Sequence, residues 1–317
     1  MKAAIRFYDE LCVQPDAIGE LLHGLEARTI APKFFYDTRG SELFEAICRL
    51  PEYYLTRTET AILRASARDI ARRTKPGVVL VELGSGASEK VRLLLDAVRP
   101  AAYLGIDISR DFLKSATRRL AQDCPWLAVH AACADFCRPL SLTYPPPELS
   151  RLLFFPGSSI GNFTPAEAEV FLRQLHPLVR PGGGFVIGID LRKDARVLHA
   201  AYNDSQGVTA AFNRNVLHRL RREYGAAVDP DAFVHEAVYN EALGRIEMYL
   251  VSTRDQEIRL SGRRFHLRDG ERLHTEYSYK YTIEGFHALA RAAGYEPEVV
   301  WTDLRRYFSV HYLRLPA

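Results

Sequence analysis

The chain has 317 residues, of which 47% are hydrophobic and 26% are charged, values typical of a folded protein and not of a disordered one. A formal net charge of +3 gives little support for a nucleic-acid partner. No apolar run approaches the roughly 18 residues of a membrane-spanning helix, and the N-terminus lacks a secretory signal pattern. The five cysteines, an odd number, do not suggest a disulfide framework. We therefore expect a cytoplasmic protein without a membrane partner.

The first part of the chain differs in pattern from the residues after it. Residues 1–57 are predicted to be helical and connective, with Ser41 as the cap of one helix. From about residue 58, helices alternate with short apolar strands, which indicates a parallel α/β sheet. The expected strands are 78–83, 102–107, 126–132, 151–155 and 184–190, and the expected helices are 58–73, 90–98, 110–121 and 165–179.

The alternation breaks after residue 191. Residues 192–280 are predicted to hold a long helical stretch followed by strands of period two. After a last helix come two apolar runs, 299–304 and 307–315, which are close enough in sequence to pair antiparallel at the end of the sheet. We therefore expect an α/β fold with a doubly wound sheet domain and a second, α+β domain. The first is predicted to consist of residues 58–191 and 281–317, and the second of residues 1–57 and 192–280.

A glycine-containing loop directly follows the first expected strand and precedes a helix. Gly84 and Gly86 permit a tight turn whose backbone N–H groups approach a ligand closely. Asp107 ends the next strand, where it can accept hydrogen bonds from ribose hydroxyls. Asp135 and Phe136 follow the third strand, where they can bind an adenine amino group and cover its face. These positions together predict a site for a nucleotide-like cofactor.

Two cofactors fit this pattern. A dinucleotide prefers G-x-G-x-x-G, but Glu89 occupies the third glycine position, and its carboxylate would face a pyrophosphate. S-adenosylmethionine carries no phosphate, and its ammonium and sulfonium groups tolerate nearby acids. Together with the terminal antiparallel strand pair, the charges favour this methyl donor over a dinucleotide or over a turn without a ligand.

Other motifs give weaker signals. Segment 157–161 matches the G-x-S-x-G of serine hydrolases, but a capping box at Thr164 starts the next helix too late for a nucleophile elbow. Cys133 and Cys137 lack companions at zinc spacing, so we expect no metal. The basic stretch 218–222 is predicted to be the solvated face of an amphipathic helix.

Seven segments, spread over nearly the whole chain, carry a recognisable pattern. They are 33–37, 50–59, 82–90, 157–162, 207–213, 245–248 and 275–278. On these segments the chain resembles the histidine Nα-methyltransferases of ergothioneine biosynthesis, which use S-adenosylmethionine to convert histidine to its trimethylated betaine, hercynine. It departs from that family at Leu55, where Pro is usual, and at Phe34, where Trp is frequent.

The resemblance implies a class I methyltransferase-like sheet domain, a substrate-binding domain and S-adenosylmethionine as the cofactor. The residues that match the family's donor-binding positions are Tyr53, Gly84, Gly86, Lys90, Asp107, Asp135 and Phe136. Those that match its amino-acid site are Tyr36, Tyr53, Gly157, Asn162, Tyr202, Met248, Glu276 and Ser278. Tyr36 and Asn162 are the expected catalytic residues, because they would orient the amine, while Tyr202 and Asn162 would hold the carboxylate. The expected ligands are L-histidine and its mono- and dimethylated forms, bound by a monomer.

One of these implications also follows from the residues themselves. Side chains alternate along 275–281, so Glu276 and Ser278 point the same way and could bind both nitrogens of an imidazole. The main alternative is methylation of another aromatic amino acid such as tryptophan, which Glu276 disfavours because a buried carboxylate facing an apolar ring lacks a partner. An RNA methyltransferase would need a more basic surface, and a non-catalytic S-adenosylmethionine-binding regulator is the alternative from another class.

Overall fold

The computed structural model describes residues 5–9, 17–140 and 149–316, and the chain divides into two compact units. Unit 1 holds the described parts of 1–12, 55–192 and 280–317, and unit 2 those of 13–54 and 193–279. Residues 1–57 were all expected in the second domain, which is wrong for β1 (Arg6–Asp9), because this strand pairs with β4 (Ala128–Cys133) in unit 1. A short, partly exposed edge strand leaves no apolar run in the sequence to predict it.

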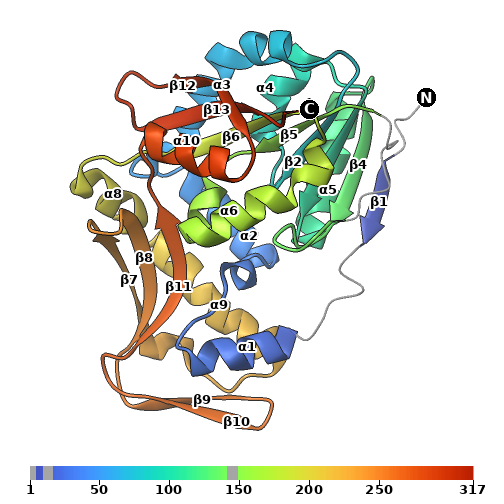
Figure 1. The fold of residues 1–317 in the computed structure, drawn as a ribbon. Coiled ribbons are helices and arrows are strands. Elements are labelled where there is room, and N and C mark those ends of the chain that lie inside the picture. Colours follow the sequence, from blue (N-terminus) through green and yellow to red (C-terminus); the bar gives the residue numbers. More distant parts are fainter. Residues whose placement is uncertain (1–4, 10–16, 141–148, 317) are drawn as a thin grey trace. The chain divides into compact units, whose positions relative to one another are not determined.

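Unit 1 is built on an eight-stranded sheet with the order β1-β4-β3-β2-β5-β6-β13-β12 (Figure 1). Its remaining strands are β2 (Val79–Leu83), β3 (Ala102–Asp107), β5 (Arg151–Phe155), β6 (Gly184–Asp190), β12 (Glu296–Thr302) and β13 (Phe308–Arg314). All neighbours pair in parallel except β13, which runs antiparallel to both β6 and β12. The predicted parallel sheet with a terminal antiparallel pair is therefore confirmed. β2, β5 and β6 are buried along their whole lengths, as central strands covered on both faces should be.

Helices of unit 1 pack against this sheet, among them α5 on β3 and β4, α7 on β5, and α10 on β12. Their bounds are α3 (Tyr54–Arg73), α4 (Glu89–Val98), α5 (Arg110–Asp123), η3 (Ser159–Asn162), α6 (Pro165–Gln174), α7 (His176–Val179) and α10 (Ile283–Ala292). A single helix was expected over 165–179, but it divides into α6 and α7, since Pro177 lacks a backbone N–H and disfavours helical backbone before it. The capping box at Thr164 is present, with Glu167 as its partner.

Unit 2 combines helices with a three-stranded antiparallel sheet of order β11-β8-β7 and a separate hairpin of β9 and β10 (Figure 1). Its helices are α1 (Ala17–Glu26), η2 (Pro32–Phe35), α2 (Thr38–Cys48), α8 (Ala195–Tyr202), α9 (Val208–Tyr224) and η4 (Pro230–Ala232). Its strands are β7 (Phe233–Asn240), β8 (Arg245–Ser252), β9 (Gln256–Leu260), β10 (Arg263–Leu267) and β11 (Arg272–Tyr279). Ser41 does not cap α2, because Asp37 accepts the Gly40 N–H and starts the helix earlier.

Within the described residues, no helix combines the length and the apolar character that a membrane crossing demands. The same residues contain no group of three or more His, Cys, Asp or Glu side chains that could hold a metal ion.

Candidate active site

The predicted donor residues of unit 1 follow three neighbouring strands, β2, β3 and β4. Gly84 and Gly86 lie in the loop after β2 with φ of +65° and +48°, a backbone conformation that favours glycine. Asp107 ends β3, and its two carboxylate oxygens accept the backbone N–H groups of Gly86 and Ser109, each at 2.9 Å. Burial raises the pKa of Asp107, and these backbone donors oppose that rise. One carboxylate thus holds the glycine loop against the end of the next strand.

Asp135 and Phe136 follow β4 and complete this edge of the sheet. Asp135 is buried, and its Oδ1 accepts the Cys137 backbone N–H at 3.0 Å. The Phe136 ring meets Phe155 edge to face, with centroids 5.5 Å apart. A Cβ added at Gly84 would lie 3.6 Å from the Phe136 ring, so this loop glycine and the aromatic ring lie close together. The three strand ends therefore meet, as a nucleotide-like ligand would require.

A buried carboxylate that the sequence analysis did not single out links two of the predicted residues. Glu59 on α3 pairs with the Lys90 ammonium, Oε2 to Nζ, at 2.5 Å. Both oxygens of Glu59 also lie 3.0 Å from the backbone nitrogen of Gly157. The sequence did hold a signal for it: Glu59 shares a helical stripe with Ile62 and Leu63, which are both buried.

The room for Glu59 comes from a glycine on β6. A Cβ added at Gly188 would lie 2.0 Å from Glu59 Oε1, which real structures essentially never show. Gly188 is therefore required for this carboxylate to reach Lys90 and Gly157. Charged groups that are buried like Glu59 are stable only when paired and hydrogen-bonded, which this arrangement provides.

The loop after β5 carries two further predicted residues, Gly157 and Asn162. Gly157 has φ of +80°, and Asn162 ends the short helix η3 with its side chain half-buried. Ser159 of the G-x-S-x-G segment donates its hydroxyl to the Pro156 carbonyl oxygen at 3.2 Å. Because η3 separates this serine from α6, the loop is not the strand-to-helix elbow of a serine hydrolase.

In unit 2, an irregularity in β11 decides which way the predicted substrate residues face. Strand pairing places Leu273 opposite Leu250, but Glu276 opposite Met248, so one extra residue, Thr275, is accommodated between them. Such a bulge re-aims the side chains that follow it. Glu276 consequently shares one face of the sheet with Met248, here called the inner face, whereas a regular strand would have placed Glu276 opposite Glu247 on the other face.

The inner face brings Glu276, Ser278, Met248 and Tyr202 together. The Tyr202 hydroxyl on α8 lies 2.7 Å from Ser278 Oγ, a hydrogen bond in which either atom could donate. All four side chains are buried, Glu276 with 9% of its surface exposed and Met248 with 2%. Sequence alternation predicted that Glu276 and Ser278 point the same way, and they do, although the bulge that achieves this was not predicted.

Aromatic rings connect the other two predicted residues of unit 2. Tyr36 meets Phe44 and Phe212 edge to face, with both pairs of centroids 5.9 Å apart. Phe44 in turn lies 6.4 Å from Tyr53, whose ring lies 6.2 Å from that of Tyr202. Burial, with Tyr202 and other neighbours, raises the pKa of Tyr53 well above its usual range. Tyr53 therefore stays neutral and keeps its O–H as a donor.

The basic stretch 218–222 is predicted to be a solvated helical face, but two of its arginines contact an earlier segment of unit 2. Arg219 Nη1 donates to the Phe34 carbonyl oxygen at 3.1 Å, and Arg222 pairs with Asp37. These contacts fix the segment that carries Tyr36. The periodicity of α9 could not reveal them, because their partners lie about 185 residues earlier in the chain.

The predicted residues are thus divided between the two units. Unit 1 carries Gly84, Gly86, Lys90, Asp107, Asp135, Phe136, Gly157 and Asn162. Unit 2 carries Tyr36, Tyr53, Tyr202, Met248, Glu276 and Ser278. Their roles toward donor and substrate stay predictions.

Comparison with known proteins places these features in context. A family model described as a histidine-specific, SAM-dependent methyltransferase matches residues 17–315. A histidine N-alpha-methyltransferase from Mycolicibacterium smegmatis is 42% identical over 282 residues, which make up 87% of this chain and 87% of that protein. Ergothioneine biosynthesis protein 1 of Neurospora crassa is 34% identical over 292 residues, 88% of this chain but 32% of that protein. The resemblance inferred from the seven segments is confirmed.

A solved structure shares the fold. An S-adenosylmethionine-dependent methyltransferase from Clostridium acetobutylicum superposes with a TM-score of 0.50 at 12% identity, covering 82% of this chain and 92% of that one.

Proposed function

The chain belongs to the family of S-adenosylmethionine-dependent, histidine-specific methyltransferases, and from this premise we propose that it trimethylates the α-amino group of L-histidine. The product is hercynine, an intermediate of ergothioneine biosynthesis. The observation that best supports the substrate is the buried pair of Glu276 and Ser278 on the inner face of β11. A carboxylate accepts an imidazole N–H, and a hydroxyl can serve the second nitrogen directly or through a water.

The residues of unit 1 suit S-adenosylmethionine. Asp107 accepts two backbone N–H groups and keeps further lone pairs for ribose hydroxyls, while Phe136 beside Gly84 offers an aromatic face to the adenine. Lys90 and Glu59 present both signs of charge, which matches a ligand end bearing an ammonium and a carboxylate. The donor, when bound, supplies an electrophilic methyl group on sulfur.

The chain's own residues then have to bind, orient and desolvate the amino acid. Glu276 and Ser278 hold the imidazole, Tyr202 and Asn162 hold the carboxylate, and Tyr36 and Asn162 orient the lone pair of the amine. Each transfer requires a neutral amine with a free lone pair, so the amine has to release a proton to solvent before each round. Because no covalent enzyme intermediate is needed, proximity and orientation supply most of the acceleration.

The test is to incubate the protein with S-adenosylmethionine and a mixture of amino acids, and to follow product masses over time. Histidine with one, two and three added methyl groups is the expected result. Methylated tryptophan in place of histidine would select the alternative substrate. Donor binding by calorimetry without any methylated amino acid would instead identify a non-catalytic regulator. The cytoplasmic location and the monomeric state stay predictions.

A further inference from the structure

Helix α9 lies between two layers of unit 2. It contacts α2 and η2 on one side, and β7 and β8 on the other. Asn213 and Asn215 of this helix have 0% and 4% of their surfaces exposed. Residues two apart on an α-helix project about 200° apart, so the two side chains point to nearly opposite sides. Burying an amide costs free energy unless its hydrogen bonds are made, so the partners of each asparagine show which segments it holds in place.

Asn213 reaches toward the inner face of the sheet. Its Nδ2 donates to the Tyr249 carbonyl oxygen and to His235 Nδ1, both at 2.9 Å, and its Oδ1 accepts the Thr275 hydroxyl at 2.8 Å. His235 Nε2 lies 2.9 Å from the Tyr202 carbonyl oxygen. Since Nδ1 accepts from Asn213, the proton sits on Nε2, which donates to Tyr202. Burial lowers the pKa of His235 and so favours this neutral form.

This one amide therefore touches the supports of two predicted substrate residues. Through His235 it fixes the backbone of Tyr202, and through Thr275 it fixes the bulge that turns Glu276 inward.

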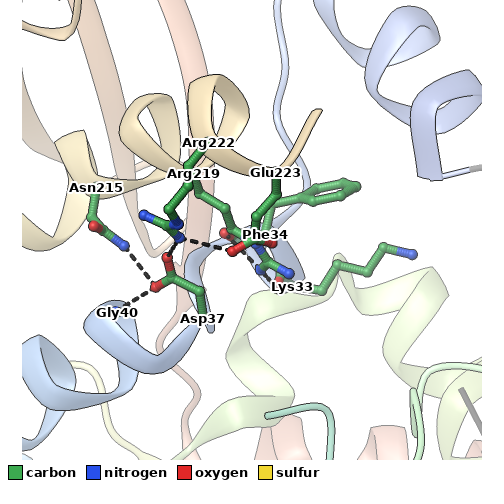
Figure 2. A network of polar contacts seen from close by, with 8 residues as sticks. All are labelled: Lys33, Phe34, Asp37, Gly40, Asn215, Arg219, Arg222 and Glu223. Atoms are coloured by element: carbon green, nitrogen blue, oxygen red, sulfur yellow. Dashed lines mark hydrogen bonds and ion pairs between the residues drawn. The ribbon is translucent and has the colours of Figure 1, made fainter. Parts of the chain in front are cut away.

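Asn215 reaches toward the opposite layer, as Figure 2 shows. Its Nδ2 donates to Asp37 Oδ1 at 2.9 Å, and the same oxygen accepts the Gly40 N–H at 2.6 Å. Arg222 pairs with the other oxygen of Asp37, which directly follows Tyr36 in the chain. On the other side of Tyr36, the backbone of η2 is held by Arg219, which donates to the carbonyl oxygens of Lys33 and Phe34.

We propose that Asn213 and Asn215 are positioning residues for different steps: Asn213 sets the groups that select and bind histidine, and Asn215 sets Tyr36, which orients the amine. The inference rests on the proposed function, because it takes the roles of Tyr36, Tyr202 and Glu276 from it. It predicts that two buried amides on one helix, two residues apart, affect different kinetic parameters when they are changed, one KM and the other kcat.

The experiment compares steady-state methylation of histidine by the wild type and by variants of each side. Thr275→Val and Asn213→Leu should raise KM for histidine about 5- to 30-fold, the equivalent of one or two hydrogen bonds, and should weaken discrimination against tryptophan. Asn215→Leu should lower kcat by a similar factor with little change in KM. Arg221→Gln, on the exposed face of the same helix, is the matched control.

Two further measurements separate positioning from a general loss of structure. Asn215→Asp places a second carboxylate beside Asp37 and should lower kcat without raising KM for histidine. Calorimetric titration with S-adenosylmethionine should give wild-type affinity for every variant.

The outcomes are distinct. A raised KM in the Asn213 and Thr275 variants, with a lowered kcat in the Asn215 variants, supports the inference. Parallel changes in KM and kcat on the two sides overturn it, while methylation of histidine by the wild type leaves the proposed function intact. A wild type that does not methylate histidine removes the proposed function and, with it, this inference.

Discussion

The two units assemble their predicted site residues by different physical means. In unit 1, the donor residues follow β2, β3 and β4, which are neighbours in the sheet, so parallel topology alone brings their ends together. In unit 2, Tyr36 follows η2, Tyr53 precedes α3, and the other residues lie on α8, β8 and β11. A bulge orients Glu276, and two buried amides contact the segments that carry Tyr36, Tyr202 and Glu276. A site built on topology is visible in a sequence, whereas one built on side-chain hydrogen bonds is not.

This comparison also bears on the effect of substitutions. A change in unit 1 should act mainly on donor binding, either through the ligand contact that it removes or, as at Asp107, through the glycine loop that the side chain holds. A change in unit 2 should act on substrate selection as well, because each buried polar group there supports another.

The largest effect is expected at Glu276. A substrate without imidazole nitrogens would bury this carboxylate without the N–H that histidine offers it, a loss of roughly 1.5–3 kcal/mol for a charged hydrogen bond. Glu276→Ala should therefore lower kcat/KM for histidine by roughly 10- to 100-fold or more. Combined with Met248→Val, it should admit larger aromatic amino acids. Competition between histidine and tryptophan, scored by methylated product, measures both effects, with exposed Glu241→Ala as a control.

Unchanged preference in both Glu276 variants would mean that this carboxylate does not contact the imidazole. The substrate assignment would then depend on the family relationship alone.

The next effect concerns the donor. Asp107→Ala should weaken S-adenosylmethionine binding by roughly 1.5–3 kcal/mol, which is about 10- to 150-fold, because a charged acceptor for two hydroxyls is lost. Exposed Asp111→Ala, at the start of the following helix, is the control. Since burial raises the pKa of Asp107, donor affinity should also fall on acidification at a higher pH than for an exposed aspartate. Equal affinities of wild type and variant in calorimetric titrations would take Asp107 out of the site.

A third test concerns the missed carboxylate, Glu59. Gly188→Ala places a Cβ 2.0 Å from Glu59 Oε1 and should displace that side chain from Lys90. We expect a loss of about 1–3 kcal/mol in the free energy of unfolding, as is usual for overpacking, together with weaker donor binding. Glu59→Gln keeps the shape and should weaken donor binding without the steric cost. Denaturant unfolding with donor titration would refute this account if Gly188→Ala were as stable as the wild type.

The last effect is a dependence of stability on pH. Burial raises the pKa of Glu82 to about 8, although a hydrogen bond from Tyr103 and the charge of Lys90 oppose this. The folded state thus keeps a proton that the unfolded state has lost, so the contribution of Glu82 to stability is full below about pH 4.5 and is lost as the pH rises to about 8.

Relative to Glu82→Gln, the wild type should therefore lose at most about 1.4 kcal/mol per pH unit across this window. Urea unfolding at pH 5.5 and pH 7.5 measures the difference, and exposed Glu89→Gln is the control. Parallel pH profiles for wild type and Glu82→Gln would show that Glu82 is ionised throughout.

The contrast between the units also explains what the sequence could and could not predict. The helix–strand alternation, the antiparallel pair β12–β13 and the positions of Asp107 and Asp135 all rest on local apolar patterns, which a sequence displays directly. β1 escaped prediction because it is a short edge strand. Glu59 was visible as a carboxylate on an apolar helical stripe but was not singled out.

Other features depend on contacts between distant segments. Nothing near Asn213 or Asn215 in the sequence indicates that their partners lie on other elements of unit 2. The sequence around Thr275 does not indicate the bulge either, because Glu276 and Ser278 fit a regular alternation of side chains. The resemblance to a known family supplied Glu276 and Ser278 as site residues, but not the reason for their orientation.

The extra residue of the β11 bulge, Thr275, determines where this strand could be shortened without turning its later side chains to the other face. Because Thr275 is the extra residue of the bulge, its deletion would leave one regular strand in which Glu276 and Ser278 still face Met248's side of the sheet. Deleting Tyr277 instead would turn Ser278 outward. A chain shortened by one residue therefore keeps its substrate-facing side chains turned inward only if the loss falls at the bulge, and it then gives up the hydrogen bond from Thr275 to Asn213.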